Sequence, residues 1–205
     1  CSSDLTLPFS RFIAGAADYT ICYYRQDFGR LNADKDSYGV PRSKSIQTTP
    51  AHQLALAAVY YSPLQYMYWY DKPSDSQDEP ELKFFDDVYT TWDDTKVLQG
   101  EVGEFITIAR RKGEEWFIGS ITNNEKRVLS VSLDFLPEGK NYIAEIYTDG
   151  DKSVKTRTKV RVSTYRVSNK TKLNFCLKAS GGGAVRLVPD DGNIKSVKNY
   201  KQQRL

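Results

Sequence analysis

Polar and apolar positions follow two different patterns on either side of about residue 100 of this chain. Before it, apolar stretches with helical spacing are separated by long polar loops. After it, short alternations of apolar and polar residues recur, as in Leu129-Ser130-Val131-Ser132-Leu133. Alternation with a period of two indicates strands that have one buried and one solvated face. The pattern therefore predicts an α+β chain in two parts.

The second part contains seven candidate strands, separated by turn residues such as Gly113, Asn123-Asn124, Gly139 and Gly150. These strands are EFITIAR, WFIGSIT, RVLSVSLDF, YIAEIYT, TKVRVSTYRV, KLNFCLK and AVRLV. Seven short strands with one wet face each are typical of an antiparallel β-sandwich. We expect this sandwich over residues 99–189. Residues 190–205 have no apolar period, and we expect a disordered tail there.

The first part begins with a short apolar stretch, Leu7–Ala14, which we expect to be a helix ended by Gly15. Ala16–Ile21 then has the composition of a short buried strand. Residues 22–49 are aromatic, charged and without a period. A loop of that length in a compact domain is usually functional or disordered.

A second helix is predicted after Thr49-Pro50, where a capping residue precedes a proline suited to the first helical position. The sequence AHQLALAAVYY is apolar on nearly all sides, so this helix should be deeply buried. We expect LQYMYWY at 64–70 to form another short helix, DKPSDSQDEP a solvated loop, and ELKFFDDV a short helix or turn.

Helix, strand, loop and buried helix follow one another as they do near the closing turn of a (β/α)8 barrel. One strand and two or three helices cannot close such a barrel, which typically needs eight strands in roughly 250 residues. Residues 1–98 are therefore predicted to be the C-terminal part of an incomplete barrel.

The composition limits the classes of partner that we expect this chain to bind. The formal net charge is +3, from 29 Lys and Arg against 26 Asp and Glu. Both signs are interspersed, so no basic stripe suggests nucleic acid. No apolar stretch reaches the roughly 20 residues of a transmembrane helix. The three cysteines, Cys1, Cys22 and Cys176, offer neither a disulfide framework nor zinc spacing. Cys1-Ser2-Ser3-Asp4 suits the lipidated start of a bacterial lipoprotein, or a chain simply cut or started there.

Four stretches together carry a family resemblance: LPFSRFIAGAADYT, TTPAHQLALAAVYYSPLQ, TTWDDTKVLQGEVGEFITIARRKGEEWFIGSITN and GKNYIAEIYTDG. In this order they resemble the C-terminal third of glycoside hydrolase family 97, bacterial α-glucosidases and α-galactosidases with a calcium-bearing (β/α)8 barrel. The resemblance implies a barrel end followed by an oligomerisation β-sandwich. It also implies an α-linked oligosaccharide substrate, a homo-oligomer, and a location in the periplasm or cell envelope of a bacterium.

The family's acid, base and calcium-binding glutamates are expected upstream of LPFSRF. Where family members often read Pro-Glu-His-Asp, this chain has Cys1-Ser2-Ser3-Asp4, so a serine replaces the glutamate. A serine hydroxyl can neither protonate a leaving oxygen at neutral pH nor neutralise a divalent cation. We therefore expect no catalytic residue and no metal ligand in this segment, and calcium only in the full-length enzyme. The stretch between Tyr24 and Ile46 is longer than the family's usual loop, which leaves substrate choice open.

Asp18 and Tyr19 are the pocket candidates, because the predicted strand places them at its C-terminal end, where barrel enzymes hold their sites. They could contact sugar hydroxyls or orient a catalytic neighbour. The alternative is a turn cap or a buried, paired carboxylate. Arg11 could pair with Asp18, or be a solvated side chain.

Other tempting residues favour structural roles. His52 is the chain's single histidine, and without a visible partner we expect a hydrogen-bonded structural role. The doublets Asp93-Asp94 and Glu114-Glu115 cannot place two carboxylates across one glycosidic bond, because adjacent strand residues point to opposite faces.

Four aromatic residues could stack on sugar rings, but packing is the more usual role at this density. They are Trp69, Tyr70, Trp92 and Trp116. Of these, Trp92 is the one that we favour for contact with a sugar. The sequence SGGG at 180–183 precedes a strand, so it is better interpreted as a turn than as a phosphate loop.

Three functional hypotheses remain. The chain is the end of a glycosidase that needs its missing N-terminal barrel, a carbohydrate-binding or oligomerisation module, or a lipid-anchored surface protein. We favour the first hypothesis.

Overall fold

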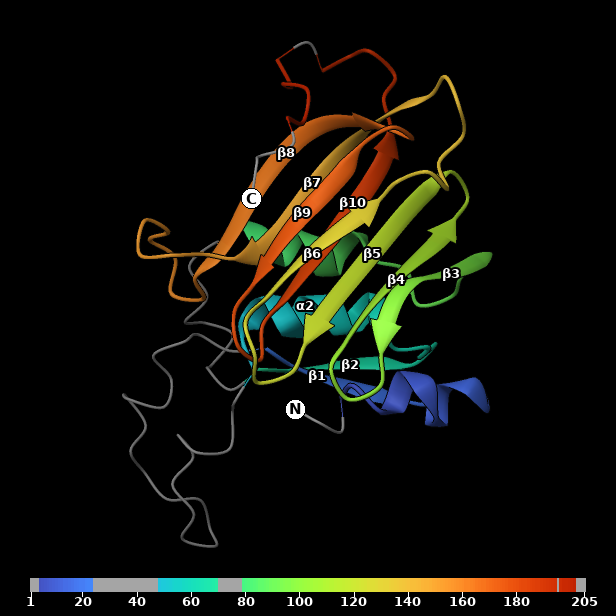
Figure 1. Cartoon of the computed structure of the whole chain (residues 1–205), viewed down its shortest axis with the longest axis vertical. Helices are drawn as coiled ribbons and strands as arrows, with labels where there is room; N and C mark the ends of the chain where they lie inside the picture. Colours follow the sequence, from blue (N-terminus) through green and yellow to red (C-terminus); the bar gives the residue numbers. More distant parts are fainter. Residues whose placement is uncertain (1–3, 24–47, 70–78, 195, 202–205) are drawn as a thin grey trace, which may run out of the picture.

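The computed structural model describes residues 4–23, 48–69, 79–194 and 196–201 (Figure 1). Its helices (η for 3-10 turns) and strands are, in chain order, η1 Leu7–Phe9, η2 Arg11–Ile13, β1 Tyr19–Tyr23, α2 Pro50–Val59, β2 Gln65–Trp69, η5 Pro80–Leu82, α3 Lys83–Asp87, β3 Asp94–Glu101, β4 Phe105–Lys112, β5 Glu115–Thr122, β6 Arg127–Ser132, β7 Asn141–Asp149, β8 Val160–Ser168, β9 Lys172–Leu177 and β10 Gly182–Pro189.

Antiparallel β-structure dominates the described chain, as expected for a sandwich. Six strands form one sheet in the order β3-β4-β5-β10-β7-β8, and every neighbouring pair is antiparallel. The antiparallel pair β6–β9 covers one face of this sheet (Figure 1). Alternate residues of both layers, such as Leu129, Val131, Phe175 and Val185, fill the core between them. The predicted alternation is therefore confirmed in these strands.

Helix α2 covers the opposite face of the six-stranded sheet (Figure 1). All ten of its residues are buried, as its apolar sequence predicted. Thr49 caps it by accepting the backbone N–H of His52 at 3.2 Å. Two glycines permit the close approach: a Cβ on Gly119 would lie 2.4 Å from the carbonyl oxygen of Ala55, and one on Gly182 would lie 2.5 Å from the Cα of His52.

Strands β1 and β2 form a separate parallel pair on the far side of α2 (Figure 1). Ile21 and Tyr23 of β1 are buried against α2, whereas Tyr66 and Met67 of β2 are exposed. Because α2 lies between β1 and β2 in the chain, the three elements form a β-α-β unit of the kind that builds parallel sheets.

The prediction of a helix at LQYMYWY is wrong, since Gln65–Trp69 is strand β2. Aromatic side chains fit strands well, and pairing with β1 supplies the backbone hydrogen bonds. The Leu7–Ala14 stretch is helical only as the two short 3-10 turns η1 and η2.

Strand β3 was not predicted, and it crosses the domain boundary that we placed between residues 98 and 99. Its side chains are largely exposed because it is an edge strand, so its sequence lacks the alternation of a half-buried strand.

The described residues after Pro189 are also more ordered than the predicted disordered tail. Tyr200 stacks edge-on against Tyr165 at 5.4 Å, and its N–H donates to the carbonyl of Arg166 at 2.9 Å. A single aromatic anchor leaves no periodic signal, which is why the pattern missed it. In the part of the chain described here, no helix is both long and apolar enough to cross a membrane.

Candidate functional site

Asp18 and Tyr19 lie at the opposite end of β1 from the one we predicted. The strand begins at Tyr19, so both residues lie at its N-terminal end, whereas barrel enzymes hold their sites at the C-terminal ends of strands. Asp18 is exposed, and Arg11 donates instead to the carbonyls of Gly15 and Ala16, each at 3.2 Å. The strand position on which the pocket role depended is therefore wrong, and the role itself stays a prediction.

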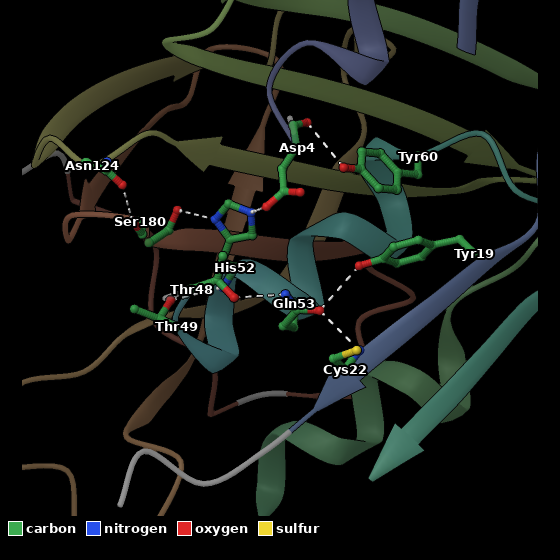
Figure 2. A network of polar contacts seen from close by, with 11 residues as sticks. Asp4, Tyr19, Cys22, Thr48, Thr49, His52, Gln53, Tyr60, Asn124 and Ser180 are labelled. Atoms are coloured by element: carbon green, nitrogen blue, oxygen red, sulfur yellow. Dashed lines mark hydrogen bonds and ion pairs between the residues drawn. The ribbon is translucent and has the colours of Figure 1, made fainter. Parts of the chain in front are cut away.

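A polar network centred on His52 joins the start of the chain to α2 and to the turn before β10 (Figure 2). The His52 ring is completely buried. Its Nδ1 lies 3.1 Å from the carbonyl oxygen of Gly181, and its Nε2 lies 3.6 Å from Oδ2 of Asp4. The hydroxyl of Tyr60 donates to the carbonyl of Asp4 at 3.3 Å. The imidazole therefore joins α2 to the turn before β10, which is the structural role expected for it, while Tyr60 holds the start of the chain to the end of α2.

Burial controls the charge of this histidine. Loss of hydration lowers the pKa of His52 from 6.5 to about 4, although the Asp4 carboxylate acts in the opposite direction. Burial likewise raises the pKa of Tyr60 well above its usual value. At neutral pH the imidazole is thus neutral, and Nδ1–H donates to Gly181 while Nε2 makes no hydrogen bond within the described residues.

Gln53 extends the same network to β1 (Figure 2). Its Oε1 accepts the backbone N–H of Cys22 at 3.2 Å and the hydroxyl of Tyr19 at 3.3 Å, while its Nε2 donates to Thr48 at 2.9 Å. Tyr19 is further held edge-on against Tyr60 at 4.7 Å. The side chain of Tyr19 is therefore engaged in packing α2 against β1.

Two buried glutamates lie where the sequence suggested only a solvated loop and a short helix. Glu81 is fully buried, and its Oε1 accepts the hydroxyls of Tyr23, at 3.0 Å, and Thr158. Glu79 pairs with Arg157, its Oε1 lying 3.3 Å from Nε. Burial raises the pKa of the Glu81 carboxyl, which the two hydroxyl donors only partly oppose. These contacts connect the C-terminal end of β1 with the loop before β8.

One signal could have located Glu81. It lies three residues before the buried Phe84 in ELKFF, and residues three apart share a helix face. Its hydroxyl donors come from distant positions in the chain, so no local pattern could have identified them.

The acidic doublets are held separately by basic or backbone partners. Asp93 accepts hydrogen bonds from Nζ of Lys112 at 2.9 Å and from the backbone N–H of Gly113 at 2.8 Å. These two hydrogen bonds lower the pKa of its carboxyl. Glu114 pairs with Lys140 at 3.1 Å, and Glu115 with Arg186 at 2.8 Å. Glu114 and Glu115 are thus paired with two different basic side chains.

The aromatic candidates have different positions. Trp116 is buried with its ring 4.7 Å from that of Phe135. Trp92 is half-buried, and its ring lies 5.5 Å from that of Phe117. Tyr70 and the side chain of Trp69 lie outside the described residues, as do Cys1 and Ser2.

The glycine-rich sequence at 180–183 leads directly into β10 at Gly182, which agrees with a turn rather than a phosphate loop. Ser180 has a left-handed backbone, with φ of 54°, and its hydroxyl donates to Asn124 at 2.9 Å. The described residues contain no group of three or more His, Cys, Asp and Glu side chains suited to hold a metal ion.

Comparison with known proteins shows which family this architecture resembles. Residues 91–188 match the family model described as "Glycosyl-hydrolase 97 C-terminal, oligomerisation". A retaining alpha-galactosidase of Bacteroides thetaiotaomicron is 34% identical over 186 residues, which cover 90% of this chain and 27% of that protein. A probable retaining alpha-galactosidase of Streptomyces bingchenggensis is 31% identical over 116 residues, covering 56% of this chain and 15% of that protein.

Solved structures agree. A glycoside hydrolase family 97 enzyme from Pseudoalteromonas sp. strain K8, in complex with acarbose, superimposes with a TM-score of 0.75 and 33% identity. The match covers 92% of this chain and 28% of that one, so the chain spans little more than a quarter of its relatives' length. Residues 91–188 are a glycosyl-hydrolase 97 C-terminal domain, and over most of its length the chain is similar to the C-terminal part of glycoside hydrolase family 97 proteins.

Proposed function

We propose that the full-length protein hydrolyses α-galactosidic or α-glucosidic bonds in oligosaccharides, and that this chain supplies the end of its catalytic barrel and an assembly domain. The observation that carries the proposal is the parallel β1-α2-β2 unit joined to an antiparallel domain through α2. All-parallel sheets occur almost only in α/β proteins in which both faces are covered, so this exposed pair favours further barrel elements around it. The similarity to a retaining alpha-galactosidase over most of the chain supports the substrate class.

We place the division between the two parts after α3 rather than at residue 98, because β3 pairs with β4 in the six-stranded sheet. The residues through Asp87 would then complete the barrel, and those from Asp94 to Pro189 would form the assembly domain. The C-terminal end of β1 would face the substrate, so Tyr23 would border the catalytic face.

Acid, base and calcium ligands would come from the N-terminal part of the barrel. We propose this because the described residues offer no cluster suited to a cation and because Glu81, the most buried carboxyl, is already engaged by Tyr23 and Thr158. In the full-length enzyme, calcium would supply a Lewis acid that polarises a substrate oxygen. We also propose that the protein resides in the periplasm or cell envelope of a bacterium.

The test compares the full-length protein with the 205-residue chain on p-nitrophenyl α-galactoside and α-glucoside, with calcium or with a chelator. We expect turnover by the full-length protein only. Calcium-dependent turnover by the chain alone, or none by the full-length protein on either substrate, would contradict the proposal. Fractionation of the producing cells tests the compartment.

A further inference from the structure

An open pocket of about 500 Å³ lies between the 3-10 turns at the chain start, the end of α2 and strands β3 and β4. Its walls are mainly apolar and include Phe12, Val59 and Ile108. The buried guanidinium of Arg110 also lines it, but its Nε and Nη2 donate to the carbonyls of Ala58 and Val59, at 2.5 and 3.0 Å. Its polar groups are therefore largely engaged in closing the end of α2.

Exposed apolar side chains surround this pocket. Ile13 is 76% exposed, Val97 65% and Tyr61 39%. Large apolar side chains gathered around a concave surface mark an interaction site more often than a solvated surface. Such a surface favours a protein partner over a sugar, which needs more unengaged polar groups.

The pocket is remote from the end of β1 that we assign to the substrate. Ile13 precedes β1, and Tyr61 lies between α2 and β2, so both are near the N-terminal ends of these parallel strands. Barrel enzymes bind substrate at the C-terminal ends. An occupant of this pocket would therefore leave the catalytic face free.

The adjacent edge of the sheet is guarded against strand addition. Lys96 lies in the middle of β3, and a register shift between Val97 and Gln99 interrupts its pairing. Edge lysines and bulges are common devices that prevent a further strand from pairing. A partner would therefore dock through side chains and not by extending the sheet.

The charges at the rim suit a second copy of the same surface. Asp93 pairs with Lys112 at 2.9 Å, and Asp94 with Lys96 at 3.5 Å, so each of the two carboxylates at the rim is neutralised by a lysine. Two such rims can face each other across a two-fold axis without net repulsion. Seven of the twelve residues that line the pocket also belong to residues 91–188, which match the family model described by the word oligomerisation.

We propose that this pocket is the contact between two copies of the protein, with the rim side chains Ile13 and Val97 of each copy entering the pocket of the other. This inference rests on the assembly role proposed above and names the surface through which the copies would associate. It does not depend on the catalytic activity.

The test is sedimentation velocity of the full-length protein, of two pocket variants and of one matched control variant. Val97→Glu places a charge at the pocket, whereas Val128→Glu places one on β6, where the valine is similarly exposed at 52%. We expect Val97→Glu, and Ile13→Glu beside it, to weaken dimerisation by about tenfold or more. Val128→Glu should assemble as the wild type does.

Three outcomes would overturn the proposal: a monomeric wild-type protein, unchanged assembly in both pocket variants, or equal loss in Val128→Glu. A lower melting temperature in Val97→Glu at unchanged mass would also overturn it, by showing that the N-terminal part of the protein covers the pocket. Turnover of p-nitrophenyl glycosides is measured separately. A dimer without turnover would refute the proposed activity and leave this inference intact.

Discussion

At the scale of single residues, glycines determine how closely α2 approaches the sheet. A Cβ on Gly119 would lie 2.4 Å from the Ala55 carbonyl oxygen and 2.8 Å from a methyl of Val59. The first of these atoms belongs to the backbone, so no rotamer change relieves the contact. Because the interface is packed this closely, one added methyl group at Gly119 would displace the helix.

We expect Gly119→Ala to lower the free energy of unfolding by about 1–3 kcal/mol, because the added methyl overpacks the interface between α2 and β5. Gly139→Ala is the control, since its Cβ would meet nothing and only its positive φ of 74° opposes the change. Urea unfolding of both variants measures the difference. A smaller loss at Gly119 than at Gly139 would contradict the close approach.

His52 makes stability depend on pH in a stated direction. Its pKa is about 4 in the folded chain against an ordinary value of 6.5, so the unfolded state binds more protons between these values. The free energy of unfolding should therefore fall as the pH drops from 6.5 toward 4, by up to about 3 kcal/mol. His52→Gln should flatten this dependence. An equal slope in wild type and variant, in denaturant titrations from pH 4 to 7, would contradict it.

At the scale of elements, Arg110 connects α2 to the sheet. It donates to the last helical carbonyls, of Ala58 and Val59, and its Nη1 donates to Thr95 at 2.8 Å. A cation at a helix C-terminus also opposes the helix dipole. Burial nevertheless lowers the pKa of this guanidinium to about 10.

Arg110→Lys should destabilise the protein by about 1–3 kcal/mol, because one ammonium cannot reproduce three donors in a fixed plane. Arg111→Lys provides a matched control, since the neighbouring side chain donates to the Gly113 carbonyl at an exposed position. Thermal unfolding of both variants separates the two cases. Equal losses would show that Arg110 acts only as a charge.

Elements were predictable from the sequence where one face is buried and the other solvated. Leu129 and Val131 of β6 alternate with serines, and that strand was predicted. β3 lies at an edge with both faces largely wet, and β2 pairs with a strand distant in the chain, so neither had a clear local signal. Glu81 was missed for the same reason, because Thr158 and Tyr23 reach it only in the folded chain.

At the scale of the whole molecule, the two parts of the chain share cores and do not merely adjoin. Phe84 of α3 packs edge-on against Phe117 at 6.0 Å and Tyr147 at 5.3 Å, both in the six-stranded sheet. On the other side of α2, the pair β1–β2 has a buried inner face and leaves Tyr66 and Met67 exposed. The two antiparallel layers therefore enclose a core of their own, whereas the parallel pair leaves side chains of β2 exposed.

This difference gives a test of the proposed barrel that needs no catalysis. Met67 is the single methionine of the chain and is 43% exposed on β2. Hydrogen peroxide should oxidise it readily in the 205-residue chain and several-fold more slowly in the full-length protein, where further barrel elements would cover β2. Alkylation of Cys176, exposed on β9, should proceed at the same rate in both and controls for general unfolding. Peptide mass spectrometry follows both reactions, and equal oxidation of Met67 in the two proteins would mean that β2 has no barrel neighbour.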